Sequence, residues 1–229
     1  MRVEREDELS AALAQLGLAP AAGALVLVGG AGGMSPEEVR RVEPLFRAAV
    51  APAAARAGAV VVDGGTDAGI MRLIGEARSA SGGSFPLLGV APASLLDGAG
   101  GTDAASDSSH PEPHHTHFVL VPGSRWGDES AWLARAATVL APGASVTLLV
   151  NGGDIAWADV ERSVAAGRRV IAVEGSGRTA DALAAAARGD ASDSRARALV
   201  ETGLVETVRW DDAEALAARL EELLRERAA

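Results

Sequence analysis

The sequence contains no cysteine, no lysine and no tyrosine among its 229 residues. Without cysteine there is no disulfide framework, no cysteine-ligated zinc site and no thiol nucleophile. Without lysine there is no Walker A lysine and no Schiff-base lysine. All 21 basic residues are therefore arginine, against 31 acidic residues, and the net charge is −10. This charge disfavours nucleic acid as a general partner, because binding to a phosphate backbone needs a basic surface.

Long apolar runs and aromatic side chains are scarce as well. No uninterrupted apolar run reaches the ~18 residues of a membrane-spanning helix, and the N-terminal MRVEREDELS is charged rather than signal-like. Aromatic residues make up 3% of the chain, too few for a base-stacking platform. We therefore expect a cytoplasmic protein with no membrane or nucleic-acid partner.

Short apolar runs alternate with segments of helical periodicity. The predicted strands are Ala24–Val28, Val60–Val62, Pro86–Val90, Phe118–Val121, Val146–Val150, Val170–Val173 and Leu204–Trp210. Helices are expected between them, including one from Pro36 towards Ala57 with an interruption at Pro52, and at the ends over Glu4–Leu16 and Asp211–Arg227. This alternation predicts an α/β fold: a Rossmann-like, doubly wound, mostly parallel sheet of six or seven strands with helices on both faces.

The chain length predicts a single domain over residues 1–229 that needs no metal for stability. Its expected parts are an N-terminal helix in residues 1–20, a core of about 24–188, and a C-terminal strand and helix in 204–229. Residues 93–116 form a long loop rich in Gly, Asp, Ser and Pro, which is typical of a lid, a binding loop or a disordered insertion.

Four histidines lie at the end of this loop. With Asp107 and Glu112 nearby they could bind a metal, but we favour the alternative that His110 and His114 are solvated, and we assign no metal site. His115 and His117 enter the next strand at alternate positions and are expected on one face of it. His117 is therefore a candidate ligand-facing residue, and a hydrogen-bonded core histidine is the alternative.

Glycine-rich turns follow four of the predicted strands: Gly29-Gly30, Gly64-Gly65, Gly152-Gly153 and Gly175–Thr179. In a parallel sheet the carboxyl ends of the strands meet at one edge, and ligands bind there at the switch point. Glycine allows close approach of a ligand to the backbone, and the free N–H groups at the start of the following helix attract anions. We therefore expect an anion site at this edge.

The first turn does not match the dinucleotide-binding fingerprint. Gly30-x-Gly32-x-x-Ser35 lacks the third glycine. Ser35 and Glu38 also have the spacing of a capping box, and Glu37 and Glu38 together satisfy the positive end of the helix that follows. A pyrophosphate would be repelled there, which disfavours an ordinary Rossmann dehydrogenase.

Arg178 is the most informative side chain in the last turn. A cation at the start of a helix opposes the helix dipole, so it needs either a nearby carboxylate or a bound anion. Glycines and hydroxyls surround it in Gly175, Ser176, Gly177 and Thr179. We favour an anion held between Arg178 and the free N–H groups of Gly177–Thr179, because arginine is suited to phosphate.

Other polar or aromatic side chains near the turns have two interpretations each. Asp63 either accepts from ribose hydroxyls or caps its own turn. Trp126 either stacks on a base or packs under its loop. Asp128 and Asp154 are expected to cap the helices that follow them. Asp159 is expected to be a helix-dipole partner, with a general acid or base as the lesser alternative.

The segments VVVDGGTDAGIMRLIGEA, HTHFVLVPG, LLVNGG and EGSGRTADALA, in this order, resemble the SLOG superfamily of Rossmann-like domains. The closest similarity is to the branch shared with the cytoplasmic N-terminal region of melastatin-type TRP channels, in a free-standing prokaryotic form, over roughly 25–187. The resemblance implies that the domain senses a nucleotide-derived ligand such as ADP-ribose, NAD or a nucleoside monophosphate. It implies phosphate and ribose contacts from Gly64, Gly65, Thr66, Gly69, Gly152, Gly153, Gly177, Arg178 and Thr179.

The same superfamily contains the cytokinin-activating phosphoribohydrolases. Their first motif, a glycine pair followed by Gly-Leu-Met, is similar to Gly64-Gly65 and Gly69–Met71. Their second motif is Pro-Gly-Gly-x-Gly-Thr-x-x-Glu. Gly152 and Gly153 match it, whereas Asn151 replaces the Pro, Ile155 and Ala156 replace the Gly-Thr, and Asp159 stands in place of the catalytic Glu. The resemblance leaves hydrolysis of nucleoside 5′-monophosphates as the alternative function, with Asp159 as the candidate catalytic residue. A third interpretation is an assembly module whose charged C-terminal helix forms homo-oligomers.

Overall fold

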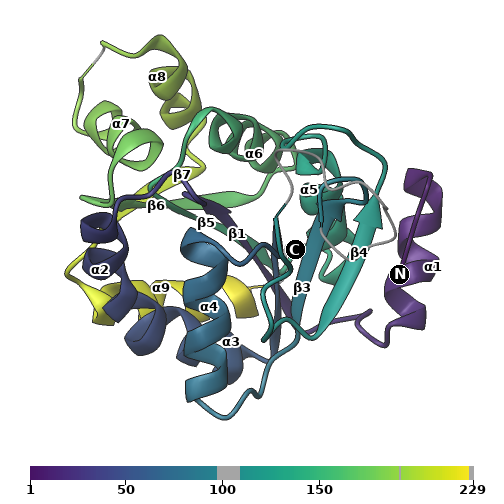
Figure 1. The fold of residues 1–229 in the computed structure, drawn as a ribbon. Helices are drawn as coiled ribbons and strands as arrows, with labels where there is room; N and C mark the ends of the chain where they lie inside the picture. Colours follow the sequence, from purple (N-terminus) through teal and green to yellow (C-terminus); the bar gives the residue numbers. More distant parts are fainter. Residues whose placement is uncertain (97–108, 191, 227–229) are drawn as a thin grey trace.

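The computed structural model describes residues 1–96, 109–190 and 192–226. Its strands form one seven-stranded sheet in the order β4-β3-β2-β1-β5-β6-β7 (Figure 1). The strands are β1 (Gly23–Gly29), β2 (Ala59–Asp63), β3 (Leu87–Pro92), β4 (His117–Val121), β5 (Ser145–Val150), β6 (Arg169–Glu174) and β7 (Val205–Arg209). Every neighbouring pair of strands is parallel. The predicted α/β fold with a doubly wound parallel sheet is confirmed.

The strand order places a switch point beside β1. β1 pairs with β2 on one side, where Leu25 faces Val61, and with β5 on the other, where Leu27 faces Leu148. After β4 the chain crosses back over the sheet to begin β5. The carboxyl ends of β1 and β5 therefore flank the crevice in which ligands of such sheets bind.

Helices cover both faces of the sheet (Figure 1). One face carries α1 (Leu9–Gln15), α5 (Ser130–Leu140), α6 (Asp154–Ala165), α7 (Arg178–Ala187) and α8 (Ser194–Glu201). The other carries α2 (Pro36–Leu45), α3 (Ala51–Ala57), α4 (Gly69–Ala80) and α9 (Ala213–Arg225). Burial on both faces explains why the strands read as continuous apolar runs rather than as alternating patterns.

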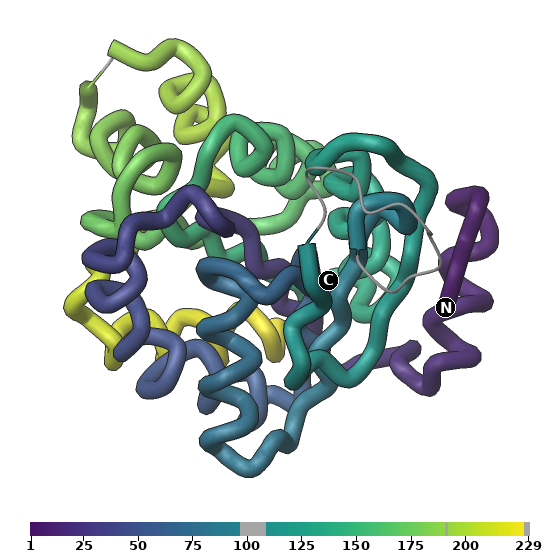
Figure 2. The backbone as a smooth tube through the Cα atoms, viewed as in Figure 1, coloured from purple at the N-terminus to yellow at the C-terminus, as the bar shows by residue number. Residues whose placement is uncertain are grey.

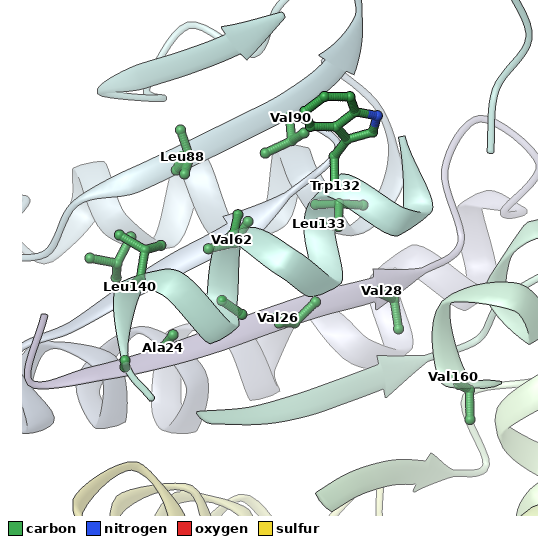
Figure 3. Close-up of a cluster of buried hydrophobic side chains, with 14 of the residues drawn as sticks. Ala24, Val26, Val28, Val62, Leu88, Val90, Trp132, Leu133, Leu140 and Val160 are labelled. Atoms are coloured by element: carbon green, nitrogen blue, oxygen red, sulfur yellow. The ribbon is translucent and has the colours of Figure 1, made fainter. Parts of the chain in front are cut away.

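The core on the α5 side shows how the two-residue period of a strand is used. Val26 of β1 and Val62 of β2 lie beneath α5 with Leu133, Trp132 of α5 lies beside Val90 of β3, and Val28 of β1 lies on the side of α6 (Figure 3). The residues between them, such as Leu27 and Val61, belong to the core on the opposite face. Side chains on both faces of the sheet therefore pack the strands near their carboxyl ends, where the glycine-rich turns begin.

The N-terminal residues protect the β4 edge of the sheet. Arg2 bridges Leu120 in parallel, and the N–H of Val3 donates to the Leu120 carbonyl at 3.0 Å. Figure 2 shows this segment beside β4, at the opposite side of the molecule from α7 and α8. In the part of the chain that the structure describes, no helix is long and apolar enough to cross a membrane.

Several helix boundaries differ from expectation. The long helix is interrupted ahead of Pro52, where a wide π-helical turn over Phe46–Val50 joins α2 to α3. Proline has no N–H to continue the ladder, which explains the wider turn. Helix α8 is not anticipated by the sequence; Asp193 caps it by accepting from two backbone N–H groups.

Two of the predicted caps are wrong. Asp128 does not cap α5, because its Oδ2 accepts from the N–H groups of Ser124 at 2.8 Å and Arg125 at 3.1 Å and so closes the preceding turn. Asp154 is the first residue of α6, and Gly153 occupies the capping position without a side-chain bond. The capping box of Ser35 and Glu38 is present as expected.

Candidate functional site

Two cavities open at the carboxyl edge of the sheet. The main cavity has a volume of about 470 Å³ and the second cavity about 430 Å³, both within the range of small-molecule sites. The main cavity is lined by Leu27, Val28, Gly29, Ala31, Gly32, Gly33, Gly64, Thr66, Ala68, Met71, Ser109, Trp126, Glu129, Leu133, Ile155 and Asp159. The second is lined by Gly152, Gly153, Asp154, Trp157, Arg178, Thr179 and Ala182.

The main cavity combines apolar walls with two buried carboxyl groups. Glu129 precedes the first turn of α5 and Asp159 lies on α6, one turn after Ile155. Burial, and to a smaller extent the charge of the neighbouring Asp159, raises the pKa of Glu129 to about 7, although the N–H of Gly127 acts to lower it. Burial also raises the pKa of Asp159 to about 6. Both groups therefore exchange protons near neutral pH.

Two buried polar atoms lie at or beside this wall. Asp159 Oδ1 and the hydroxyl of Ser130, which adjoins Glu129 but does not line the cavity, are buried and form no hydrogen bond of ordinary geometry among the described residues, although Ser130 lowers the pKa of Asp159. An unpaired buried polar atom costs roughly 1–3 kcal/mol. Such atoms in the wall of a cavity mark a place where a ligand can supply the missing bonds.

The second cavity lies between the N-termini of α6 and α7. Arg178 begins α7 with a left-handed φ of 50°, which is uncommon for a residue other than glycine. Its guanidinium donates to the carbonyl of Gly33, in the turn that lines the main cavity. Arg178 is the only basic residue among the described residues that line either cavity. It therefore links the two cavities and supplies their positive charge.

Asn151 holds the turns after β5 and β6 together. It also has a left-handed φ, of 61°. Its Nδ2 donates to the Ser176 carbonyl at 2.7 Å and to Glu38 Oε1 at 2.8 Å, and its backbone N–H donates to the Ser176 hydroxyl at 2.7 Å. Its Oδ1 accepts from the N–H of Gly152 at 2.9 Å. Asn151 thus occupies a framework position that fixes α2, α6 and α7 around the second cavity.

A buried ion cluster, formed by Asp63, His115 and Glu112, anchors the turn after β2. His115 Nε2 lies 2.8 Å from Asp63 Oδ1, and its Nδ1 lies 2.7 Å from Glu112 Oε2. Burial alone would lower the pKa of His115, but the two carboxylates raise it to about 9, so both ring nitrogens donate. Hydrogen bonds from His115 and His114 lower the pKa of Glu112 in spite of its burial. In the described part of the chain, no cluster of acidic and histidine residues has the arrangement of a metal site.

The structure brings many of the sequence-predicted residues to the two cavities and leaves others outside. Gly29, Gly64, Thr66, Trp126 and Asp159 line the main cavity. Gly152, Gly153, Arg178 and Thr179 line the second. Gly30, Asp63, Gly65, Gly69, His117, Gly175, Ser176 and Gly177 do not line either one.

Packing explains the position of several glycines outside the cavities. A Cβ on Gly65 would lie 2.6 Å from the Phe118 ring, and one on Gly69 would lie 2.1 Å from the Gly30 carbonyl oxygen. The Gly30 carbonyl accepts a hydrogen bond from the N–H of Ile70, so this N–H group at the start of α4 is bonded to the turn after β1. A Cβ on Gly175 would meet Trp210 at 2.3 Å.

The polar residues outside the cavities have their own partners. Asp63 is fully buried and accepts from the N–H of Gly65 at 2.7 Å, so it caps its own turn. The expectation that His115 and His117 share a strand face is wrong, because β4 begins only at His117. His117 lies at the amino end of β4, opposite the edge with the cavities, and contacts Thr116. Residues 97–108 of the predicted loop lie outside the described residues.

Glu129 is the main functional candidate that sequence reasoning missed. It follows directly on Asp128, and only the turn geometry shows that Asp128 closes the loop while Glu129 is buried at the cavity. Asn151 carried a usable signal, because asparagine before a glycine pair at a strand end is typical of a left-handed turn.

Solved structures share this fold at low sequence identity. The molybdenum cofactor carrier protein of Chlamydomonas reinhardtii matches with a TM-score of 0.57 and 15% identity, over 89% of this chain and 99% of its own. A structural genomics target named TM1055 matches with a TM-score of 0.56 and 21% identity, over 87% and 99%. The molybdenum cofactor binding protein of Rippkaea orientalis matches with a TM-score of 0.51 and 12% identity, over 81% and 88%.

Among curated proteins no match was found. The family model described as "SLOG in TRPM, prokaryote" matches residues 22–219, which include all seven strands and the residues that line both cavities. The match confirms the resemblance drawn from the glycine-rich turns. The chain belongs to the prokaryotic branch of the SLOG family that is related to TRPM channels.

Proposed function

We propose that this protein binds a nucleotide-derived small molecule, such as ADP-ribose or an NAD-related product, across the two cavities. The observation that carries the proposal is the position of Arg178, which lines the second cavity and bonds to the turn that lines the main one. These ligands have a matching division, because a ribose separates the uncharged aromatic ring of the adenine from the negatively charged diphosphate. Arginine and two helix N-termini are suited to the phosphate.

The main cavity supports the ring end of such a ligand. Leu133, Ile155 and Met71 give it apolar walls, and Trp126 adds an aromatic side chain on which a base can stack. Family membership supports a nucleotide ligand, and the two solved structures described as molybdenum cofactor proteins support ligand binding on this fold in general.

Replacing Arg178 by alanine is expected to weaken nucleotide binding about tenfold to a hundredfold, because a charge-assisted bond to phosphate is lost. Isothermal titration calorimetry with ADP-ribose, NAD and AMP measures the effect. Arg188→Ala is the matched control, since Arg188 follows the same helix but pairs with Glu174 away from both cavities. Binding that Arg178→Ala leaves unchanged, or wild-type protein that binds none of the three, contradicts the proposal.

A specific observation favours hydrolysis as the second candidate function. Glu129 and Asp159 face the same cavity with pKa values of about 7 and about 6. In such a reaction water adds to C1′ of the ribose and the N-glycosidic bond breaks. One carboxyl group gives its proton to the departing base, and the other carboxylate takes the proton of the water. The products are ribose 5-phosphate and free base.

We expect binding without turnover. In the phosphoribohydrolase motif a Gly-Thr pair supplies backbone and hydroxyl contacts near the phosphate, and Ile155 and Ala156 stand in place of this pair here. Incubation with purine nucleoside monophosphates, followed by chromatography for free base, checks this expectation. Release of base that disappears in Asp159→Asn would establish the second function instead. Release that persists equally in Asp159→Asn would exclude Asp159 as the acid or base.

A further inference from the structure

The two charged side chains that line the main cavity are both acidic, whereas its other polar side chains, Thr66, Ser109 and Trp126, are neutral. Glu129 and Asp159 are its only titratable residues among those described, and no basic side chain lines it. Asp159 is nine-tenths buried, and its Oδ1 forms no hydrogen bond of ordinary geometry among the described residues. Glu129 Oε2 accepts from the N–H of Gly127 at 2.8 Å, and the backbone N–H of Glu129 itself also acts on this carboxyl group. The wall therefore presents two carboxyl groups and, among the described residues, no basic side chain to pair with them.

The chemistry of this wall restricts what enters the cavity. A phosphate would face two carboxyl groups with no cation and would be repelled. An apolar ring would remove water from the two carboxyl groups without supplying a hydrogen bond in return, which costs free energy. A ring that carries an amino group supplies N–H donors while its faces contact apolar side chains.

We propose that Glu129 and Asp159 recognise the amino-bearing edge of the ligand's heterocycle and thereby set which end of the nucleotide enters the main cavity. The inference rests on the proposed function and goes beyond it by assigning the ring to the main cavity and the phosphate to the second. Glu129 and Asp159 are specificity-determining residues in this arrangement.

Helix α6 provides the geometry for this division. Ile155 and Asp159 are four residues apart, so they share one face of the helix, and both line the main cavity. Asp154 and Trp157 lie on another face and line the second cavity. The first turn of α6 thus stands between the two cavities. A ligand that occupies both has to pass this turn, with its phosphate towards Arg178.

The inference is tested with two ligands that differ by one amino group. AMP and purine riboside 5′-monophosphate share ribose, phosphate and ring, but only AMP has the 6-amino group. In calorimetric titrations at about pH 8, where both carboxyl groups are ionised, we expect wild-type protein to bind AMP about tenfold more tightly, because a hydrogen bond to a charged group is lost with the second ligand. Glu129→Gln and Asp159→Asn are each expected to reduce this preference to about threefold, since a neutral acceptor binds a donor more weakly.

Matched variants separate recognition of the ring from the binding of phosphate. Asp154→Asn removes a carboxylate from the same helix, but on the face that lines the second cavity, and is expected to keep the preference. Arg178→Ala is expected to weaken both ligands alike and to keep their ratio. A Glu129→Leu, Asp159→Leu double variant is expected to bind both ligands equally, and the isosteric single variants serve where the double variant is unstable.

The failure of this inference is distinguishable from the failure of the proposed function. Equal affinity of wild-type protein for both ligands, with binding that still depends on Arg178, overturns the inference alone. The same holds for a preference that persists undiminished in Glu129→Gln and Asp159→Asn. Wild-type protein that binds neither ligand, nor ADP-ribose or NAD, overturns both.

Discussion

Replacing His115 by leucine is expected to lower the free energy of unfolding by about 3–5 kcal/mol near pH 7, as is typical when one partner of a buried ion pair is removed. The His115 side chain is fully buried between Asp63 and Glu112. Without its positive charge, two buried carboxyl groups lose their common partner: Asp63 Oδ1 keeps only the N–H of Gly65, and Glu112 keeps only its bonds from His114. Equilibrium denaturant unfolding measures the loss. The matched control is His117→Leu, which changes a half-buried histidine two residues away and is expected to cost less than about 1 kcal/mol.

The pH dependence of the stability of wild type and His115→Leu provides a second measurement. The pKa of His115 is raised in the folded protein to about 9, so its contribution is fully present below the unfolded pKa of about 6.5 and is lost as the pH rises through about 9. The difference in stability between wild type and His115→Leu should therefore shrink between pH 7 and pH 10. Glu112, whose pKa is lowered, adds stability above its unfolded pKa that is lost on acidification. A difference that stays constant over this range would contradict the ion cluster.

Replacing Gly75 by alanine is expected to destabilise the protein by about 2–4 kcal/mol, although alanine in a helix interior is favoured over glycine by about 1 kcal/mol. A Cβ on Gly75 of α4 would lie 2.2–2.3 Å from the carboxyl atoms of Glu112. A glutamate at the surface would simply turn away. Glu112 is buried, and its carboxylate accepts from the N–H of His114 at 2.9 Å and from the rings of His114 and His115. Moving it breaks these bonds.

A double-mutant cycle isolates the cause of this loss. In a Glu112→Ala background the space beside Gly75 is open, so Gly75→Ala is expected to be neutral or stabilising by up to about 1 kcal/mol. Thermal or denaturant unfolding of the four proteins gives the coupling free energy. Additive effects of the two substitutions would show that Gly75 and Glu112 act independently.

The fold is predictable from the sequence because its signals are local. Runs such as Val60–Val62 and Val146–Val150 indicate buried strands, and a capping box at Ser35 and Glu38 indicates the start of a helix. Each signal depends on the side chains within a few residues. Alternation of strands and helices then leaves few arrangements, of which the doubly wound sheet is one.

Which residue of a turn lines a cavity and which one packs inside the protein is not predictable in this way. Gly64 and Gly65 are equivalent in the sequence, yet Gly64 lines the main cavity while Gly65 packs against Phe118. The difference depends on what stands opposite each residue, which comes from a distant strand. His115 is a similar case: it precedes β4 in the chain but pairs with Asp63 at the end of β2.

The position of β1 has a consequence for how the chain is made. β1 ends at Gly29, whereas β5, its second neighbour in the sheet, begins only at Ser145. A ribosome that adds ~5–20 residues per second needs on the order of ten seconds to cover this interval. Throughout that time one side of the most central strand is an open edge, and open edges of apolar strands pair with other chains. Nascent chains that stop after β4 should therefore require chaperones, whereas those that extend past β5 should not.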